Sequence, residues 1–211
     1  MCSPTRPGTR SASSWPDGTV IVLVTGHAAA GTSTIAPLLA DELDALWISR
    51  DRIHEMVYSG WRPQHPALTA DTYDPRVGDS LFFEGSVVWD IFLWMLQLVS
   101  ARVPVVADTP FNHEWNRSMF EAAAGGLTGP LVEVALHGDA DVLLRRARRR
   151  AASGEVHEIK ARFSVRAPDY YAAAYQPVLP QEQVVHVDTT DLDAVDIADV
   201  ASQVRERLSA G

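Results

Sequence analysis

The sequence has almost no cysteine and almost no lysine. Cys2 is the one cysteine among 211 residues. A single thiol cannot build a disulfide framework or a multi-cysteine metal site, so we expect a reducing, cytoplasmic setting. Lys160 is the one lysine among 18 basic residues. A site for anions must therefore rely mostly on arginine, whose planar guanidinium can bind a phosphate through two parallel hydrogen bonds.

The sequence also lacks an excess of positive charge and a long apolar run. Its formal net charge is −9, which argues against a dedicated nucleic-acid binder or a protein held on anionic lipid. The most hydrophobic stretch, residues 87–99, is shorter than the roughly 20 residues that a membrane span needs. Residues 1–18 contain no apolar core of a signal peptide, and we expect a loose tail there. These features favour a small-molecule partner, without nucleic acid or membrane.

Short apolar strands alternate with helical patterns over the rest of the chain. We expect strands at about residues 20–24, 45–48, 103–111, 131–137 and 184–187, and helices at about 32–44, 49–57, 77–102, 139–150, 167–176 and 193–208. This alternation predicts a three-layer α/β fold, in which a mostly parallel five-stranded sheet carries helices on both faces. A single domain over residues 19–211 is expected, with a lid at about residues 145–167.

The most informative stretch joins the first strand to the first helix. Its glycines have the spacing of the phosphate-binding loop G-x-x-x-x-G-K-[ST], except that Thr32 stands in the lysine position. Loop amides and a helix N-terminus attract phosphate, and Ser33 stands where a hydroxyl binds Mg²⁺. The alternative is a tight connection whose small residues serve packing. The residues predicted to hold the phosphates are Gly26, His27, Ala28, Ala29, Ala30, Gly31, Thr32, Ser33 and Thr34.

Two aspartates follow predicted strands, at the edge where open α/β sheets bind ligands. Asp108 ends an apolar strand, as does the acidic residue that holds Mg²⁺ or orients the phosphate acceptor in phosphotransferases. Asp51 follows the second strand and could equally cap the next helix. Asp108 could equally serve a turn. His113 and Arg117 come next in the chain and are either within reach of a substrate or solvated caps.

Five arginines stand among the six residues 145–150, at the end of a predicted helix. The polar stretch after them suits a lid, whose arginines could close on a transferred phosphoryl group and exclude water. Two alternatives remain: a solvated face that favours the helix C-terminus, or a contact with nucleic acid.

In this order the motifs resemble those of the small P-loop kinases, above all the chloramphenicol phosphotransferase-like and zeta-toxin-like groups. The matching pieces are Gly26-x-x-x-x-Gly31-x-Ser33, Ser49-Arg-Asp-Arg52, Val105-Val-Ala-Asp108, Leu144 to Arg150 with Ser153-Gly-Glu-x-His157, and Val187-Asp-Thr-Thr190. The resemblance implies transfer of the γ-phosphoryl group of ATP or GTP, with Mg²⁺, to a hydroxyl of an antibiotic, a nucleoside-like natural product or a metabolite. A monomer or a homodimer is expected.

The resemblance also implies roles for single residues. Asp51 would be the base that accepts the proton of the acceptor hydroxyl, and Ser33 and Asp108 would hold the metal. The expected lid groups are Arg146, Arg149 and Arg150; the residues expected near the nucleotide base are Asp188 and Thr189; those expected near the substrate are Arg52, His113 and Arg117.

Thr32 puts the predicted activity in question. Loss of one charge aimed at the developing phosphoryl charge is commonly worth about 3 kcal/mol, or about a hundredfold in rate. Arg50, Arg52, a lid arginine or Lys160 could supply the charge instead. A sulfotransferase-like enzyme would explain Gly31-Thr-Ser33 directly, although alanines 28–30 stand where that loop carries a basic residue. A third hypothesis is a nucleotide-binding protein without catalysis.

Overall fold

One five-stranded sheet forms the centre of the molecule. The computed structural model describes residues 19–61, 79–111, 114–153 and 168–210. The strand order is β2-β3-β1-β4-β5, and every neighbouring pair is parallel. The strands are β1 (Ile21–Gly26), β2 (Leu46–Ser49), β3 (Val105–Asp108), β4 (Leu131–His137) and β5 (Val184–Asp188). The predicted parallel α/β sheet is confirmed.

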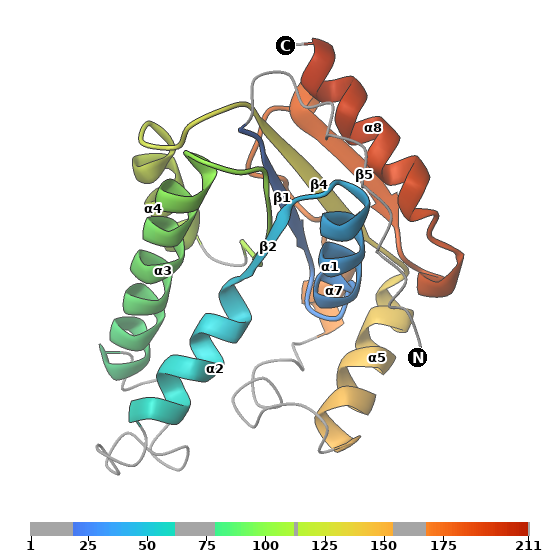
Figure 1. Cartoon of the computed structure of the whole chain (residues 1–211). Helices are drawn as coiled ribbons and strands as arrows, with labels where there is room; N and C mark the ends of the chain where they lie inside the picture. Colours follow the sequence, from blue (N-terminus) through green and yellow to red (C-terminus); the bar gives the residue numbers. More distant parts are fainter. Residues whose placement is uncertain (1–18, 62–78, 112–113, 154–167, 211) are drawn as a thin grey trace, which may run out of the picture.

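Helices cover both faces of this sheet, as expected (Figure 1). One face packs against α1 (Thr32–Glu42), α5 (Ala140–Ser153), α7 (Pro168–Ala172) and α8 (Ile197–Ala210). The other face packs against α2 (Arg50–Trp61), α3 (Asp79–Ser100) and α4 (Glu114–Ala124). Each face has its own hydrophobic core, so the sheet separates two apolar layers.

Strand β1 explains why the site lies where it does. Val22 and Val24 belong to the core on the α1 face, whereas Ile21 and Leu23 belong to the core on the other face. Burying each of these side chains contributes about 1.5–3 kcal/mol relative to exposure. Strand β1 lies between β3 and β4. The strands β2 and β3 therefore lie on one side of β1, and β4 and β5 lie on the other side, so the loop after β1 begins where the strand order reverses its direction along the sheet. Open α/β sheets bind ligands at such a point.

Several element boundaries differ from the expected ones for identifiable reasons. Only Pro168–Ala172 of the helix expected at 167–176 is helical. Pro177 disfavours a helical conformation at Gln176, the last residue of the expected helix. The last helix begins at Ile197 rather than near residue 193. Its cap is Asp196, whose carboxylate accepts the amides of Ala198 and Asp199. Asp191 accepts the amide of residue 193 in a short 3-10 turn instead.

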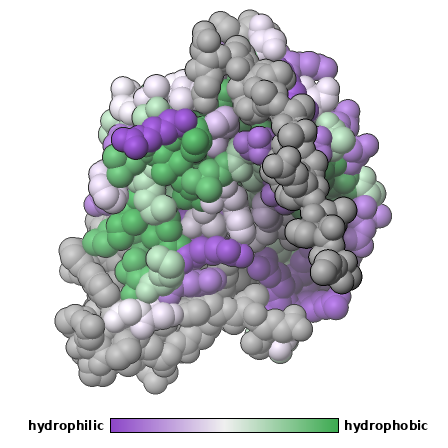
Figure 2. Space-filling view, viewed as in Figure 1, coloured by the Kyte–Doolittle hydropathy of each residue, from purple (hydrophilic) through white to green (hydrophobic). Residues whose placement is uncertain are grey.

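On the face drawn in Figure 2, hydrophobic and hydrophilic side chains gather mainly over different helices. Hydrophobic side chains lie over the α3 side, and hydrophilic ones over α5 and α8 (Figure 2). Helix α3 buries Trp89, Phe92 and Leu96, while Trp94 and Leu98 are exposed. No helix in the described part of the chain is long and apolar enough to cross a membrane.

Some expectations fall outside the described residues. They are the tail at residues 1–18, the outer part of the lid at residues 154–167, His113 and Lys160. The division into a tail, a domain and a lid stays a prediction.

Candidate phosphate-binding site

The loop after β1 has the backbone of a tight turn into a helix. Gly26 has φ 154°, and a Cβ atom there would lie 2.6 Å from the carbonyl oxygen of Leu136. Gly31, at φ 97°, is the N-cap of α1, and its carbonyl accepts the amides of Thr34 and Ile35. A glycine cap has no side chain to accept an amide, and helix geometry leaves the first amides without intrahelical acceptors. An anion in front of α1 would satisfy them.

A second segment of the chain holds this loop from the α7 side. The amide of Ala28 donates to the hydroxyl of Tyr170 over 3.1 Å. The Nε2 atom of His27 lies 2.9 Å from the carbonyl oxygen of Ala173. The imidazole meets the rings of Tyr170 and Tyr175 edge to face, at centroid distances of 4.8 and 5.4 Å. Sequence reasoning missed these contacts, because no local pattern links residues so far apart in the chain.

Asp108 is fixed by side chains from the neighbouring strand. Its carboxylate is buried and accepts the indole N–H of Trp47 over 2.6 Å and the hydroxyl of Ser49 over 3.2 Å. Val106, two residues earlier, packs on the α1 face, so Asp108 lies on that face too, because alternate residues of a strand share a side. This is also the face on which α1 packs, with Ser33 in its first turn.

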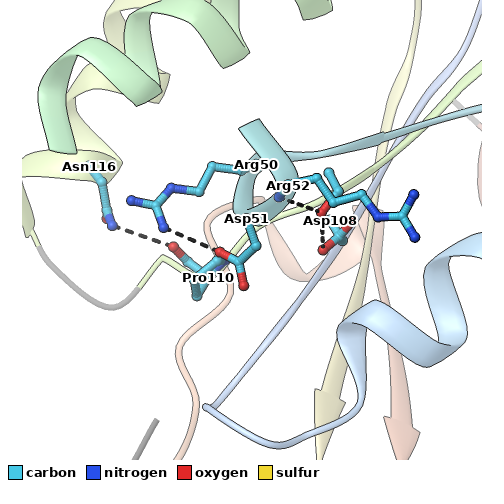
Figure 3. A network of polar contacts seen from close by, with 7 residues as sticks. Arg50, Asp51, Arg52, Asp108, Pro110 and Asn116 are labelled. Atoms are coloured by element: carbon cyan, nitrogen blue, oxygen red, sulfur yellow. Dashed lines mark hydrogen bonds and ion pairs between the residues drawn. The ribbon is translucent and has the colours of Figure 1, made fainter. Parts of the chain in front are cut away.

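Asp51 lies in the first turn of α2, beside the same sheet edge (Figure 3). The amide of Arg52 donates to Ser49, so Ser49 rather than Asp51 provides the cap contact seen here. The Asp51 carboxylate forms an ion pair with Arg50 over 3.2 Å. Asp108 thus ends β3 and Asp51 lies two residues after β2, so both lie at the carboxyl ends of adjacent parallel strands.

The two arginines beside Asp51 stack on indole rings. The guanidinium carbon of Arg50 is 5.8 Å from the ring centroid of Trp89, and that of Arg52 is 4.3 Å from that of Trp47. Cation–π contacts of this kind are worth about 0.5–1 kcal/mol at exposed sites. Trp47 therefore touches both Asp108 and Arg52, a link that the sequence did not indicate.

The arginines of α5 differ in their exposure and in their hydrogen bonds. Arg146 donates to the carbonyl oxygens of Thr189 and Thr190, over 2.6 and 2.9 Å. Arg150 lies one turn further along the same flank and is half-buried, whereas Arg149 is exposed. The helix thus directs Arg146 and Arg150 toward the side of the turn after β5, and Arg149 toward solvent.

The turn after β5 is fixed by its own hydrogen bonds. Thr189 is buried and donates both its amide and its hydroxyl to the carbonyl of His137. The carboxylate of Asp188 accepts the amide of Thr190, and hydrogen bonds from Thr190 hold the pKa of Asp188 below its usual value. The two residues expected near the nucleotide base therefore lie in a rigid turn beside Arg146.

Arg117 and Glu133 form a polar cluster under the loop. Arg117, expected near a substrate, donates to the carbonyls of Gln176 and Pro177. Glu133 is fully buried on β4 and accepts the hydroxyl of Thr25 over 2.6 Å. Burial raises the pKa of Glu133, against the opposing effect of its hydrogen bonds. The sequence signal for this residue was a glutamate inside an otherwise apolar strand.

Tyr175 belongs to the same cluster. Burial raises its pKa to about 12, and the nearby charge of Glu133 acts in the same direction. The tyrosine is therefore neutral over the physiological pH range and acts as a ring and a hydroxyl rather than as a phenolate.

Among the described residues, no group of three or more His, Cys, Asp or Glu could hold a metal ion. Mg²⁺ in nucleotide sites needs no such cage, because one or two protein oxygens, substrate phosphates and water complete its octahedron. The hydroxyl of Ser33 and the carboxylate of Asp108 are oxygen donors of the right kind.

The parallel sheet and the glycine loop after its central strand define a P-loop kinase-like fold. A family model described as "AAA domain" matches residues 21–165, more than half of the chain. The protein therefore belongs to that family. None of the curated proteins matches the chain.

Three solved structures illustrate the likeness. A proposed kinase from Chloroflexus aurantiacus is 21% identical, with a TM-score of 0.65, over 93% of this chain and 100% of that one. The tunicamycin resistance protein of Deinococcus radiodurans is 16% identical, with a TM-score of 0.54, over 90% and 95%. The APS kinase of Mycobacterium tuberculosis, solved with AMPPNP and APS, is 16% identical, with a TM-score of 0.52, over 92% and 99%. At such identities these structures confirm the fold.

Proposed function

We propose that the protein is a small-molecule kinase that transfers the γ-phosphoryl group of ATP or GTP to a hydroxyl. The observation that carries this proposal is the joint position of three groups at one sheet edge. They are the glycine-capped start of α1, Asp108 at the end of β3 and Asp51 after β2. Phosphoryl transfer requires little covalent chemistry from the protein, so positioning and charge account for most of the catalysis.

Each of the three groups has a defined task in this proposal. Amides of the loop and of the first turn of α1 bind the polyphosphate, while Ser33 and Asp108 would hold Mg²⁺. The metal supplies charge that offsets the phosphate charge during transfer. Asp51 orients the acceptor hydroxyl and takes its proton, which leaves late in a loose transition state. The ion pair with Arg50 helps to hold the Asp51 carboxylate in place for this task.

We further propose that Arg150 supplies part of the charge that Thr32 lacks. Arg50 and Arg52 stack on indole rings, and Arg146 is bonded to two carbonyls. Arg150 is on the same flank of α5 as Arg146 and lies at the base of the proposed lid. Arg149 is exposed on another side of the helix, so we assign it a smaller part than the sequence suggested.

The acceptor class follows the resemblance to chloramphenicol phosphotransferase-like and zeta-toxin-like proteins. We propose a hydroxylated antibiotic, nucleoside-like product or metabolite, modified in a reducing cytoplasm by a monomer or a homodimer. Thr32 favours a second candidate, a protein that binds the nucleotide without catalysing transfer.

Thermal unfolding in the presence of nucleotides tests these proposals. Protection by ATP or GTP with Mg²⁺ supports a kinase site, because a ligand that binds only the folded state raises Tm. Protection by adenosine 3′,5′-bisphosphate alone supports a sulfotransferase-like enzyme instead. A screen of hydroxylated compounds for acceptor-dependent release of nucleoside diphosphate then separates the kinase from the non-catalytic binder. If none of these nucleotides raises Tm, all three hypotheses are contradicted.

A further inference from the structure

We propose that Glu133 and Arg117 are positioning residues that hold residues 173–179 against the phosphate loop and so preset the loop for a nucleotide. We call residues 173–179 the strap. The strap leaves α7 beside the loop and leads toward the start of β5. We call the contacts of Glu133 and Arg117 with the strap the tether. The inference rests on the proposed function only for its effect on nucleotide binding, since the tether itself is a property of the free protein.

Glu133 fixes the far end of the strap. One carboxylate oxygen accepts the amides of Val178 and Leu179, over 2.7 and 2.8 Å. The other oxygen accepts the hydroxyl of Thr25, the residue before Gly26. A buried carboxylate is costly unless it is well hydrogen-bonded, and this one has three donors. A single side chain therefore joins the strap to the root of the phosphate loop.

Arg117 fixes the middle of the strap from the side of α4. Its guanidinium donates to the carbonyls of Gln176 and Pro177, immediately before the two amides that Glu133 binds. Four successive residues of an irregular segment are thus bonded through their backbones to two side chains of opposite charge. An irregular segment whose backbone is bonded in this way can adopt few other conformations.

The near end of the strap meets the phosphate loop itself. The carbonyl of Ala173 lies against the Nε2 atom of His27, and the ring of Tyr175 packs on the imidazole. Tyr170, in the helix that leads into the strap, accepts the amide of Ala28 and packs on the same imidazole. Displacement of the strap would therefore release His27, and with it the loop.

This arrangement compensates for a weakness of the loop. Residues 28–31 are three alanines and a glycine, so the loop has few side chains of its own to hold it in shape. Without the usual lysine, binding depends on backbone amides, which are most effective when they are already oriented. Ordering a mobile loop upon binding would weaken affinity, and a tether removes that cost.

Nucleotide affinity of strap variants tests the proposal. We expect Glu133→Leu and Arg117→Gln to weaken binding of a fluorescent ATP analogue with Mg²⁺ by about tenfold. Glu133→Gln should retain most of the affinity, because its amide oxygen can still accept the strap amides while its NH₂ donates to Thr25. The matched control is Arg205→Gln. Arg205 also donates to a backbone carbonyl, that of Glu42, at the opposite end of α1 from the phosphate loop.

Tyr170→Phe serves as a second variant that leaves the buried carboxylate intact. It removes only the hydroxyl that accepts the Ala28 amide, and we expect weaker nucleotide binding with unchanged folding. Tighter binding would show that Tyr170 competes with phosphate for this amide, which would overturn the positioning role. Equal affinity of Glu133→Leu, Arg117→Gln and Arg205→Gln, all folded, would overturn it as well.

Hydrogen exchange separates this inference from the proposed function. In the absence of nucleotide, amides of residues 26–31 should exchange faster in Arg117→Gln and Glu133→Leu than in the wild type, and not faster in Arg205→Gln. If the wild type binds no nucleotide, the proposed function fails while the exchange result still decides the tether. Unchanged exchange in the loop of the folded variants would refute the tether.

Discussion

Restoring the lysine of the phosphate loop is the sharpest test of the site. Thr32 is the first residue of α1, follows the cap Gly31 directly and is half-exposed, so a longer side chain there does not replace a core residue. A lysine there adds one positive charge aimed at the outer phosphates. Such a charge is worth about 3 kcal/mol in the transition state, or about a hundredfold in kcat/KM. Thr32→Lys should therefore be faster than the wild type in acceptor-dependent release of diphosphate.

The substitution has an opposing effect on stability. A cation in the first turn of a helix faces the positive end of its dipole, at a cost of about 0.3–1 kcal/mol, so Tm should fall slightly while activity rises. Leu38→Lys is the matched control, because Leu38 is an exposed residue further along α1. A folded Thr32→Lys whose nucleotide affinity and rate equal those of the control would refute the assignment of the loop as the polyphosphate site.

Three further predictions concern single residues of the site. Asp51→Asn should lower kcat by about a hundredfold or more and leave Tm nearly unchanged, because Ser49 makes the cap contact; an unchanged kcat would exclude Asp51 as the base. Gly31→Ala should weaken nucleotide binding and lower Tm, because alanine at φ 97° is strained. Gly125→Ala, with nothing within 4 Å of the added Cβ, is its control, and equal losses of Tm would contradict the strain argument. Burial raises the pKa of Glu133 above its ordinary value of 4.5, so stability falls as pH rises from 4.5 through the folded pKa. Glu133→Gln lacks this loss, and its Tm relative to the wild type should rise across that window; a constant difference would contradict the pKa direction.

The features predicted correctly from the sequence are those set by local pattern. The alternation of five short apolar runs with helical patterns was sufficient to predict the parallel sheet. The spacing of Gly26 and Gly31 was sufficient to predict where the loop between the first strand and the first helix lies. The orientation of the α5 arginines was not predicted, because Arg146, Arg149 and Arg150 were grouped together, although the positions of the apolar residues in this helix indicate it. Leu143, Leu144 and Ala147 are buried, and at 100° per residue this face places Arg146 and Arg150 together on one flank. Arg149 then points to solvent.

The features that sequence reasoning missed depend on contacts between distant segments. The strap is irregular and carries no periodic pattern. Its shape is imposed by Arg117 and Glu133, which stand about 60 and 45 positions earlier in the chain. The order of the strands is likewise a property of the whole fold. The role of Ser49 was missed for a local reason, since it follows from where α2 begins, and helix ends are uncertain by one or two residues.

The caps of the helices distinguish a phosphate site from a packing turn. The amides at the start of α2, α5 and α8 are accepted by Ser49, Asp139 and Asp196. Helix α1 instead has Gly31 as its N-cap, which makes no side-chain hydrogen bond, although Ser, Thr, Asp or Asn at an N-cap stabilises a helix by about 1 kcal/mol. A connection selected for packing alone would gain from such a residue. A loop that receives an anion gains from its absence, because a side-chain oxygen would compete with the phosphate for the same amides.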